Sequence, residues 1–316
     1  MSADDLDRHL DAYLAVREAL GLSVGANARL LRDFVGHARA AGLPIRAGTA
    51  VTWACDAAPP TCGAAGKAHR LSVARRFLNY LAAVLPGTEV PGPGMLPSPT
   101  RRCPYLFTPD EIARLVAAAA TAPPRGTLRP IALSTLIGLL ASTGLRVGEA
   151  VRLTMADVRL DEEPANLRVL QTKFRKSRIV PLHPTTAAAL GHYCLQRQNL
   201  GYHALSDAFL VTERGGFHCP GLLNQWFAGL TRRLGLWPTD GGRRPCLHSL
   251  RHTFAVRRLE AWHAEGRDVS ALLPSLSVYL GHVRPQDTYW YLTATPTLLR
   301  LAGTRFQLDP RAGGVP

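Results

Sequence analysis

The chain has 316 residues, of which 47% are hydrophobic and 19% charged, a composition typical of globular proteins that excludes wholesale disorder. At about 100 to 200 residues per domain, this length predicts two domains. Lysine and arginine number 37 against 23 acidic residues, so the formal net charge is +14. Such a field attracts polyanions, and nucleic acid is the leading partner class, although an inert basic surface would have the same composition.

Nothing in the chain resembles a targeting or membrane segment. The opening "MSADDLDRHLDAYL" is acidic and amphipathic, and no run of about 18 uncharged apolar residues occurs. We therefore expect a soluble, cytoplasmic protein that is not exported. The cysteines form neither CxxC pairs nor a zinc-site spacing, so they are expected to be free thiols without a bound metal: Cys55, Cys62, Cys103, Cys194, Cys219 and Cys246.

Residues 1–88 are predicted to form a small, all-helical domain. Apolar residues at helical spacing indicate helices over about 6–20, 30–42 and 67–85, with a short one around 51–57, and Gly42 suits a helix C-cap. The last helix carries basic residues on what the spacing predicts to be its more exposed sides. These are candidate contacts to a DNA backbone, although a solvated charged face is the more frequent reason for such a pattern: Lys67, Arg70, Arg75 and Arg76.

Residues 89–105 are predicted to be a linker, because six prolines lie between Pro86 and Pro104 and leave few backbone donors for a helix or a central strand. The second domain, 106–316, opens with "FTPDEIARLVAAAA". Here Thr108 is the expected N-cap, Pro109 the first helical residue and Glu111 the partner in a capping box.

The second domain is predicted to be mainly helical with one small β-hairpin. A helix begins near 128, and "NLRVLQTKFRKSRIVPL" indicates two short strands around a basic turn. Helices follow over about 184–200, 221–234, 248–264 and 269–280, with shorter ones over 286–293 and 296–302. The expected fold class is thus mainly α with a small sheet, an all-helical first domain and an α+β second domain.

The segment "TGLRVGEA" is the first of three short segments, called islands below, whose side chains are suited to bind or react with a phosphodiester. Arg146 lies at the start of a helix with Glu149 one turn on. A guanidinium there can bind two phosphate oxygens while the carboxylate fixes its orientation. Alone, an Arg/Glu pair at this spacing is more often an ordinary helix salt bridge.

The basic turn "KFRKSR" is the second island. Lys173 on such a turn can reach a leaving-group oxygen and donate a proton to it, the task of a general acid. Arg175, Lys176 and Arg178 in the same segment are candidate DNA contacts. An isolated basic turn is more often a nonspecific phosphate contact.

The helix that opens "HSLRHTFAVRRL" is the third island. Leu247, Leu250 and Phe254 form its expected core stripe, while His248 and Arg251 lie together on the neighbouring face. One imidazole and one guanidinium would then point the same way. Taken by itself, a histidine here is more often satisfied by a backbone carbonyl.

Downstream, "LGHVRPQDTYWYL" supplies His282, Tyr289 and Tyr291. A phenol with a pKa near 10 is a poor nucleophile at neutral pH, so it attacks phosphorus only with cationic neighbours or a base, which the other islands would provide. Packing or stacking is the ordinary role of such aromatic residues.

The order of these islands resembles the catalytic hexad of the tyrosine recombinases, the phage integrase family. "TGLRVGEA", "TKFRKSRIVPL", "HSLRHTFA" and "LGH" occur with family-like separations, and the N-terminal domain is similar to the family's SAM-like core-binding clamp. The tyrosine expected nine residues after His282 is Tyr291, with Tyr289 as the alternative. The sequence around Tyr291, "VRPQDTYWYLTATP", differs from the Ser/Thr-rich sequence that is common at this position in the family. The implied catalytic set is Arg146, Lys173, His248, Arg251, His282 and Tyr291.

The resemblance implies DNA cleavage and rejoining through a 3′-phosphotyrosyl link that needs neither ATP nor metal. Lys173 would protonate the departing 5′ oxygen, the two arginines would neutralise the phosphate and His248 would act as base. His282 would hydrogen-bond the phosphate. The family assembles as a tetramer on two duplex DNA sites, and Pro296 to Phe306 is the candidate segment that docks on the next protomer, although it could equally pack within its own chain.

Within the family, "DTYWYLTATP" with "PYLFT" is similar to enzymes of transposon-like mobile elements, which implies integration or excision, with sister recombinases as further partners. Two alternatives remain open. One is a type IB topoisomerase-like relaxing enzyme, which works as a monomer. The other is a noncatalytic DNA-binding protein on the same scaffold.

Overall fold

The computed structural model describes residues 3–22, 24–42, 44–97, 103–170, 177–202, 206–240, 242–293, 300 and 303. The chain divides into two compact units, residues 1–101 and 102–316, and the division falls within the segment predicted as a linker. Its helices and single small sheet match the predicted fold class. Among the described helices, none combines the length and the apolar character needed to cross a membrane.

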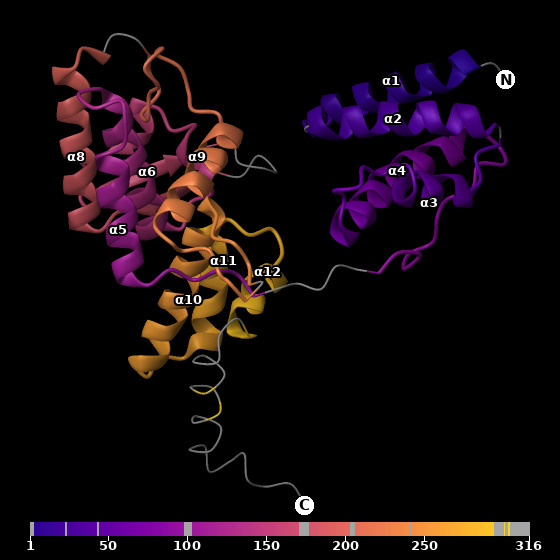
Figure 1. Ribbon diagram of the computed structural model, residues 1–316. Helices are drawn as coiled ribbons and strands as arrows, with labels where there is room; N and C mark the ends of the chain where they lie inside the picture. Colours follow the sequence, from indigo (N-terminus) through magenta and orange to yellow (C-terminus); the bar gives the residue numbers. More distant parts are fainter. Residues whose placement is uncertain are drawn as a thin grey trace, which may run out of the picture. The chain divides into compact units, whose positions relative to one another are not determined.

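The N-terminal unit is a bundle of four helices, as the apolar spacing predicts. These are α1 (Ala3–Ala19), α2 (Gly25–Ala41), α3 (Ala47–Cys55) and α4 (Ala64–Val84), with α1 and α2 side by side in Figure 1. Large side chains from all four helices fill the core, including Leu10, Phe34, Trp53 and Phe77. Burial of these apolar side chains provides the main stabilisation of a unit this small.

Arg70 is buried, and the prediction that it lies on an exposed side of its helix is therefore wrong. Only 7% of the residue is exposed, and its guanidinium lies 4.0 Å from the centre of the Trp53 ring. It also donates hydrogen bonds to the Asp33 carboxylate at 3.2 Å and the Trp53 carbonyl at 3.1 Å. These contacts hold the side chain within the bundle, where a charge is tolerated because it is paired and stacked.

The predicted linker begins as part of this bundle. Arg75 donates from Nε to the Pro91 carbonyl at 2.8 Å and from Nη2 to the Gly92 carbonyl at 2.7 Å. Val90 and Leu96 pack against the core of the unit. Of the four basic residues proposed to contact DNA from α4, Arg76 is exposed and Lys67 is half-buried, whereas Arg75 is committed to the linker backbone.

The C-terminal unit opens with α5 (Pro109–Ala120), whose predicted capping box is present. The Thr108 hydroxyl accepts from the Glu111 N–H at 3.1 Å, and the Glu111 carboxylate accepts from the Thr108 N–H at 2.8 Å. Figure 1 shows α5, α6 (Leu128–Thr143) and α8 (Pro184–Asn199) packed side by side, and α6 contacts both of the others. The strongly apolar α6 therefore lies at the centre of this half of the unit.

A three-stranded antiparallel sheet lies between α6 and α8 in the sequence. Its order is β1 (Val158–Arg159), β2 (Asn166–Val169), β3 (Arg178–Pro181), with Leu167 opposite Val180. The two predicted strands are β2 and β3. The two-residue β1 is too short to leave an alternating pattern in the sequence. The basic turn between β2 and β3, residues 171–176, lies outside the described residues.

The remaining elements carry most of the predicted site. They are α7 (Val147–Ala150), η1 (Met155–Asp157), α9 (Pro220–Arg233), α10 (Leu247–Ala264), α11 (Val269–Leu280), α12 (Gln286–Tyr289) and η3 (Trp290–Thr293). A buried cluster joins α10, α11 and η3, and includes Leu259, Leu273, Leu280 and Tyr291. The predicted nucleophile is thus anchored in the same core as the helix that carries His248 and Arg251.

Candidate active site

Three arginines that are far apart in the sequence converge on the C-terminal end of α11. Arg178 donates to the Tyr279 carbonyl at 2.8 Å, Arg251 to the Leu280 carbonyl at 2.7 Å and Arg146 to the Gly281 carbonyl at 2.9 Å. The last carbonyls of a helix lack partners within it, and the helix dipole makes this end favourable for cations. The end of α11 therefore fixes the positions of three guanidinium groups.

Glu149 is the carboxylate that holds two of these arginines. Its Oε1 accepts from Arg146 at 2.8 Å and from Arg178 at 3.2 Å, while its Oε2 accepts from Arg178 at 2.8 Å and from the Arg146 backbone N–H at 3.0 Å. Burial alone would raise the pKa of Glu149. The hydrogen bonds and charge of Arg178, with those of Arg146, lower it to about 2. Three cations against one anion leave this cluster with an excess of positive charge suited to a phosphate.

Two glycines make these close approaches possible. Gly144 ends α6 at a φ of 64°, and a Cβ there would lie 2.5 Å from the Phe254 ring; its carbonyl accepts from Arg251 at 2.8 Å. Gly281 follows α11 at a φ of 66°, where a Cβ would lie 2.8 Å from an Arg178 nitrogen. The glycines of "TGLR" and "LGH" therefore let backbone and guanidinium groups meet.

We expect Glu149→Gln to lower the free energy of unfolding by about 3 kcal/mol at neutral pH, because it removes the buried counter-charge of the half-buried Arg146 and Arg178. In the wild type, the folded-state pKa of about 2 lies below the ordinary value of 4.5, so the carboxylate stabilises the fold above pH 4.5. This contribution, about 3 kcal/mol, is lost as the pH falls from about 4.5 towards 2. Urea unfolding at a series of pH values measures it.

A matched control is Glu265→Gln, which changes an exposed carboxylate of the same unit. It should keep both the neutral-pH stability and the acid loss of the wild type. Equal pH dependence in Glu149→Gln and the wild type would show that Glu149 does not carry the ion-pair network.

His248 and Arg251 lie on the same helix with different degrees of burial. Arg251 is only 1% exposed, whereas His248 is exposed. Partial desolvation by neighbouring atoms and then the positive charges of Arg251, Arg146 and Arg243 lower the pKa of His248 to about 4. His248 is therefore neutral at pH 7. Burial first and the charge of Arg146 next lower the pKa of Arg251 to about 10, so Arg251 stays charged.

The two candidate nucleophiles differ sharply in environment. Tyr289, on α12, is 48% exposed, whereas Tyr291, on η3, is 2% exposed. The Tyr291 hydroxyl lies 3.0 Å from Nδ1 of His252, and its ring stacks on that of His282 at 6.2 Å between centres. Nδ1 of His282 is in turn 2.7 Å from the Thr288 hydroxyl. The structure thus brings Tyr291 together with Arg146, Arg251, His248 and His282.

Two features of this site are missing from the sequence prediction. His252 stands beside Arg251 in "HSLRHTFA", and its spacing from His248 places the two rings on one face of α10, with centres 4.5 Å apart. That spacing was the available signal. Arg178 was predicted to contact DNA, but its side chain is 10% exposed and supports Glu149 and α11. Lys173, Arg175 and Lys176 lie outside the described residues.

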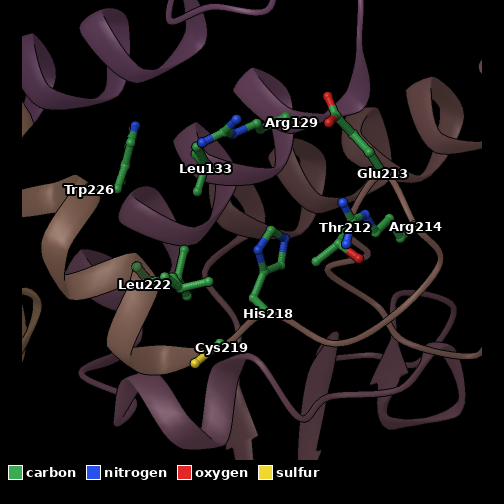
Figure 2. A pocket seen from close by; sticks show the side chains of 10 residues that line it. Arg129, Leu133, Thr212, Glu213, Arg214, His218, Cys219, Leu222 and Trp226 are labelled. Atoms are coloured by element: carbon green, nitrogen blue, oxygen red, sulfur yellow. The ribbon is translucent and has the colours of Figure 1, made fainter.

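A separate pocket of about 350 Å³ lies where the start of α9 meets α6. Figure 2 shows His218 between Leu222 and Thr212, with Arg129 and Leu133 of α6 above it. Desolvation, and then the charge of Arg129, lower the pKa of His218. Of the predicted catalytic residues, Arg146, His248, Arg251, His282 and Tyr291 are described by the structure, and none of these five lines the pocket.

Comparisons with known proteins place this chain in a family. A sequence model of the Phage integrase family matches residues 106–297. Integrase/recombinase y4rE of Sinorhizobium fredii (strain NBRC 101917 / NGR234) is 39% identical over 306 residues, covering 96% of each chain. Integrase/recombinase y4rB of the same strain is 38% identical over 301 residues, covering 93% of this chain and 95% of its own.

Solved structures share the fold at low sequence identity. XerH site-specific recombinase bound to palindromic difH substrate in a post-cleavage complex has a TM-score of 0.68 at 18% identity, covering 97% of this chain and 85% of its own. The Tn1549 transposon integrase in complex with transposon right end DNA has a TM-score of 0.67 at 14% identity, covering 95% and 99%. At these identities the likeness concerns the fold alone.

Proposed function

Because this chain belongs to the phage integrase family of tyrosine recombinases, enzymes that cleave and rejoin DNA strands, we propose that it forms a 3′-phosphotyrosyl intermediate through Tyr291. The observation that supports this most directly is the convergence of Arg146 and Arg251 on the end of α11 beside the Tyr291 ring. Together they provide two cations for the nonbridging oxygens and one nucleophile for phosphorus.

The reaction conserves the energy of the phosphodiester bond. The Tyr291 oxygen attacks phosphorus and the 5′ oxygen leaves with a proton, which we assign to Lys173 as general acid. The 5′ hydroxyl of a second strand then attacks the phosphotyrosyl bond and releases the tyrosine. Neutral His248, beside the arginine cluster, and His282, beside Tyr291, are proposed to hydrogen-bond the phosphate.

The substrate is proposed to be a pair of duplex DNA sites, bound in the cytoplasm by a tetramer of this chain or by a mixed assembly with sister recombinases. The net charge of +14 favours such a polyanionic partner. Similarity to integrase/recombinases y4rB and y4rE supports integration or excision of a mobile element.

A nicked suicide duplex tests the proposal, because loss of a short 3′ product prevents religation and traps the adduct. A pool of random fragments of the genomic DNA that flanks the gene supplies the first candidate cleavage sites. We expect a covalent protein–DNA complex that resists denaturation, with nucleotide attached to a peptide that contains Tyr291. Binding without any adduct would support the noncatalytic alternative. Relaxation of supercoiled plasmid by a monomer, without strand exchange, would support the topoisomerase alternative.

A further inference from the structure

We propose that His252 is the general base of the cleavage step and takes the phenolic proton of Tyr291. The inference rests on the proposed function, since it assigns a residue to that reaction. The main observation behind it is the 3.0 Å distance between His252 Nδ1 and the Tyr291 hydroxyl oxygen, which is within the hydrogen-bond distance expected of a general base and its proton donor. Both residues are buried, at 8% and 2% exposure, so water competes little for this contact.

The surrounding packing holds the two groups in this geometry. The Trp290 ring meets the His252 ring edge-on at 5.5 Å and the Tyr291 ring at 5.4 Å. The His252 and Tyr291 rings are themselves 5.5 Å apart between centres. His252 stands on the long helix α10, while Tyr291 belongs to the apolar cluster that joins α10 to α11. Reacting groups held on rigid elements gain from proximity and orientation.

The other two histidines are less suited to receive this proton. A general base works best when its pKa lies near the operating pH. Desolvation first, and then the positive charges of the arginine cluster, lower the pKa of His248 to about 4, so it holds a proton weakly at pH 7. Nδ1 of His282 is 2.7 Å from the Thr288 hydroxyl, and its ring stacks on Tyr291 instead of meeting the phenolic oxygen end-on.

The proton and the electrons balance in a single step. With its own proton on Nε2, neutral His252 accepts the Tyr291 O–H proton on Nδ1 and becomes imidazolium. The phenolic electron pair forms the new P–O bond, and the 5′ oxygen departs with a proton from the general acid. Within the part of the chain that the structure describes, the titratable and charged groups around this contact include His248, Arg251, Arg146, Arg178, Glu149 and His282.

The test compares single-turnover adduct formation by wild type, His252→Asn and His192→Asn. Asparagine places an amide group near the position of Nδ1, so it keeps a hydrogen bond to Tyr291 but cannot take up a proton. We expect His252→Asn to react about 100-fold more slowly near neutral pH, with a deficit that shrinks as rising hydroxide concentration replaces the base. His192, an exposed histidine on α8, is the matched control and should behave like wild type.

A second substrate separates the base from the acid. In a duplex with sulfur in place of the bridging 5′ oxygen, the thiolate leaves without protonation, because a thiol has a pKa near 8.5. The His252→Asn deficit should persist on this duplex, whereas the deficit of Lys173→Ala should largely disappear. Disappearance of the His252→Asn deficit would move His252 to the leaving-group side and overturn the proposal.

Two further results would overturn it. One is a His252→Asn deficit of equal size at every pH from about 6 to about 9, which would indicate a structural role. The other needs no variant: a wild-type rate that keeps rising tenfold per pH unit across that range would exclude any histidine base. Because adduct formation by the wild type is measured in the same experiment, failure of this assignment is distinguishable from failure of the proposed function.

Discussion

Tyr291→Phe is expected to abolish the covalent protein–DNA adduct while DNA binding is retained. The substitution removes one oxygen and leaves the ring in its contacts with Trp290 and His282. Phenylalanine has no atom that can bond to phosphorus, so no other feature of the site can compensate. The cost in folding free energy should be modest, roughly 1 to 3 kcal/mol, because the substitution removes the buried hydrogen bond between Tyr291 and His252.

Tyr289→Phe is the matched control, because Tyr289 is two residues away on the same segment and is 48% exposed. It should form the adduct at the wild-type rate. The measurement is denaturing electrophoresis of end-labelled suicide duplex after incubation, with a gel-shift assay of the same duplex to report binding. An adduct that persists in Tyr291→Phe and is lost in Tyr289→Phe would transfer the nucleophile to Tyr289.

Helix positions follow from the sequence because each depends on local periodicity and capping. The apolar spacing of α10 and α11 and the Thr108 capping box depend on residues that are close together in the chain, and the structure contains all three. Likewise, the motif "TGLRVGEA" is sufficient to predict the pairing of Arg146 with Glu149, since these residues are one helical turn apart.

Long-range partners could not be predicted in the same way. Arg146 meets Gly281 across 135 residues, and Arg251 meets Gly144 across 107. No periodicity in the sequence encodes such a pair. For the same reason Arg178 was expected to contact DNA, whereas it is bonded to Glu149, 29 residues away. Arg70 was expected to be exposed, although its charge is held by Asp33, 37 residues away, and by the Trp53 ring.

The distinction between Tyr289 and Tyr291 also depends on tertiary structure. Both tyrosines follow His282 within one short helical segment, and the sequence around them differs from the one common in the family. Only the turn from α12 into η3 directs Tyr291 into the cluster with Leu259, Leu273 and Leu280. The role of His252 was not predicted for a related reason: its partner Tyr291 is 39 residues away in the sequence.

Arg251→Lys is expected to slow adduct formation by roughly 100- to 1000-fold, the usual consequence of losing a preorganised charge at the reacting group. The guanidinium of Arg251 is 1% exposed and spans two carbonyls, with Nη1 bound to Gly144 and Nη2 to Leu280. A lysine ammonium is a single point charge and cannot span both carbonyls while it also faces a phosphate. One buried carbonyl then loses its partner, at a cost of about 1 to 3 kcal/mol in folding free energy.

Single-turnover cleavage at saturating DNA separates these two consequences. If Arg251 acts on the reacting phosphate, the rate falls far more than the fraction of folded protein, which urea unfolding reports independently. Arg258→Lys, an exposed arginine two turns along the same helix, should change neither quantity. A loss of activity that follows only the loss of folded protein would make Arg251 a structural link between α6, α10 and α11. A rate loss in fully folded protein would instead support its role as a cation that stabilises the transition state.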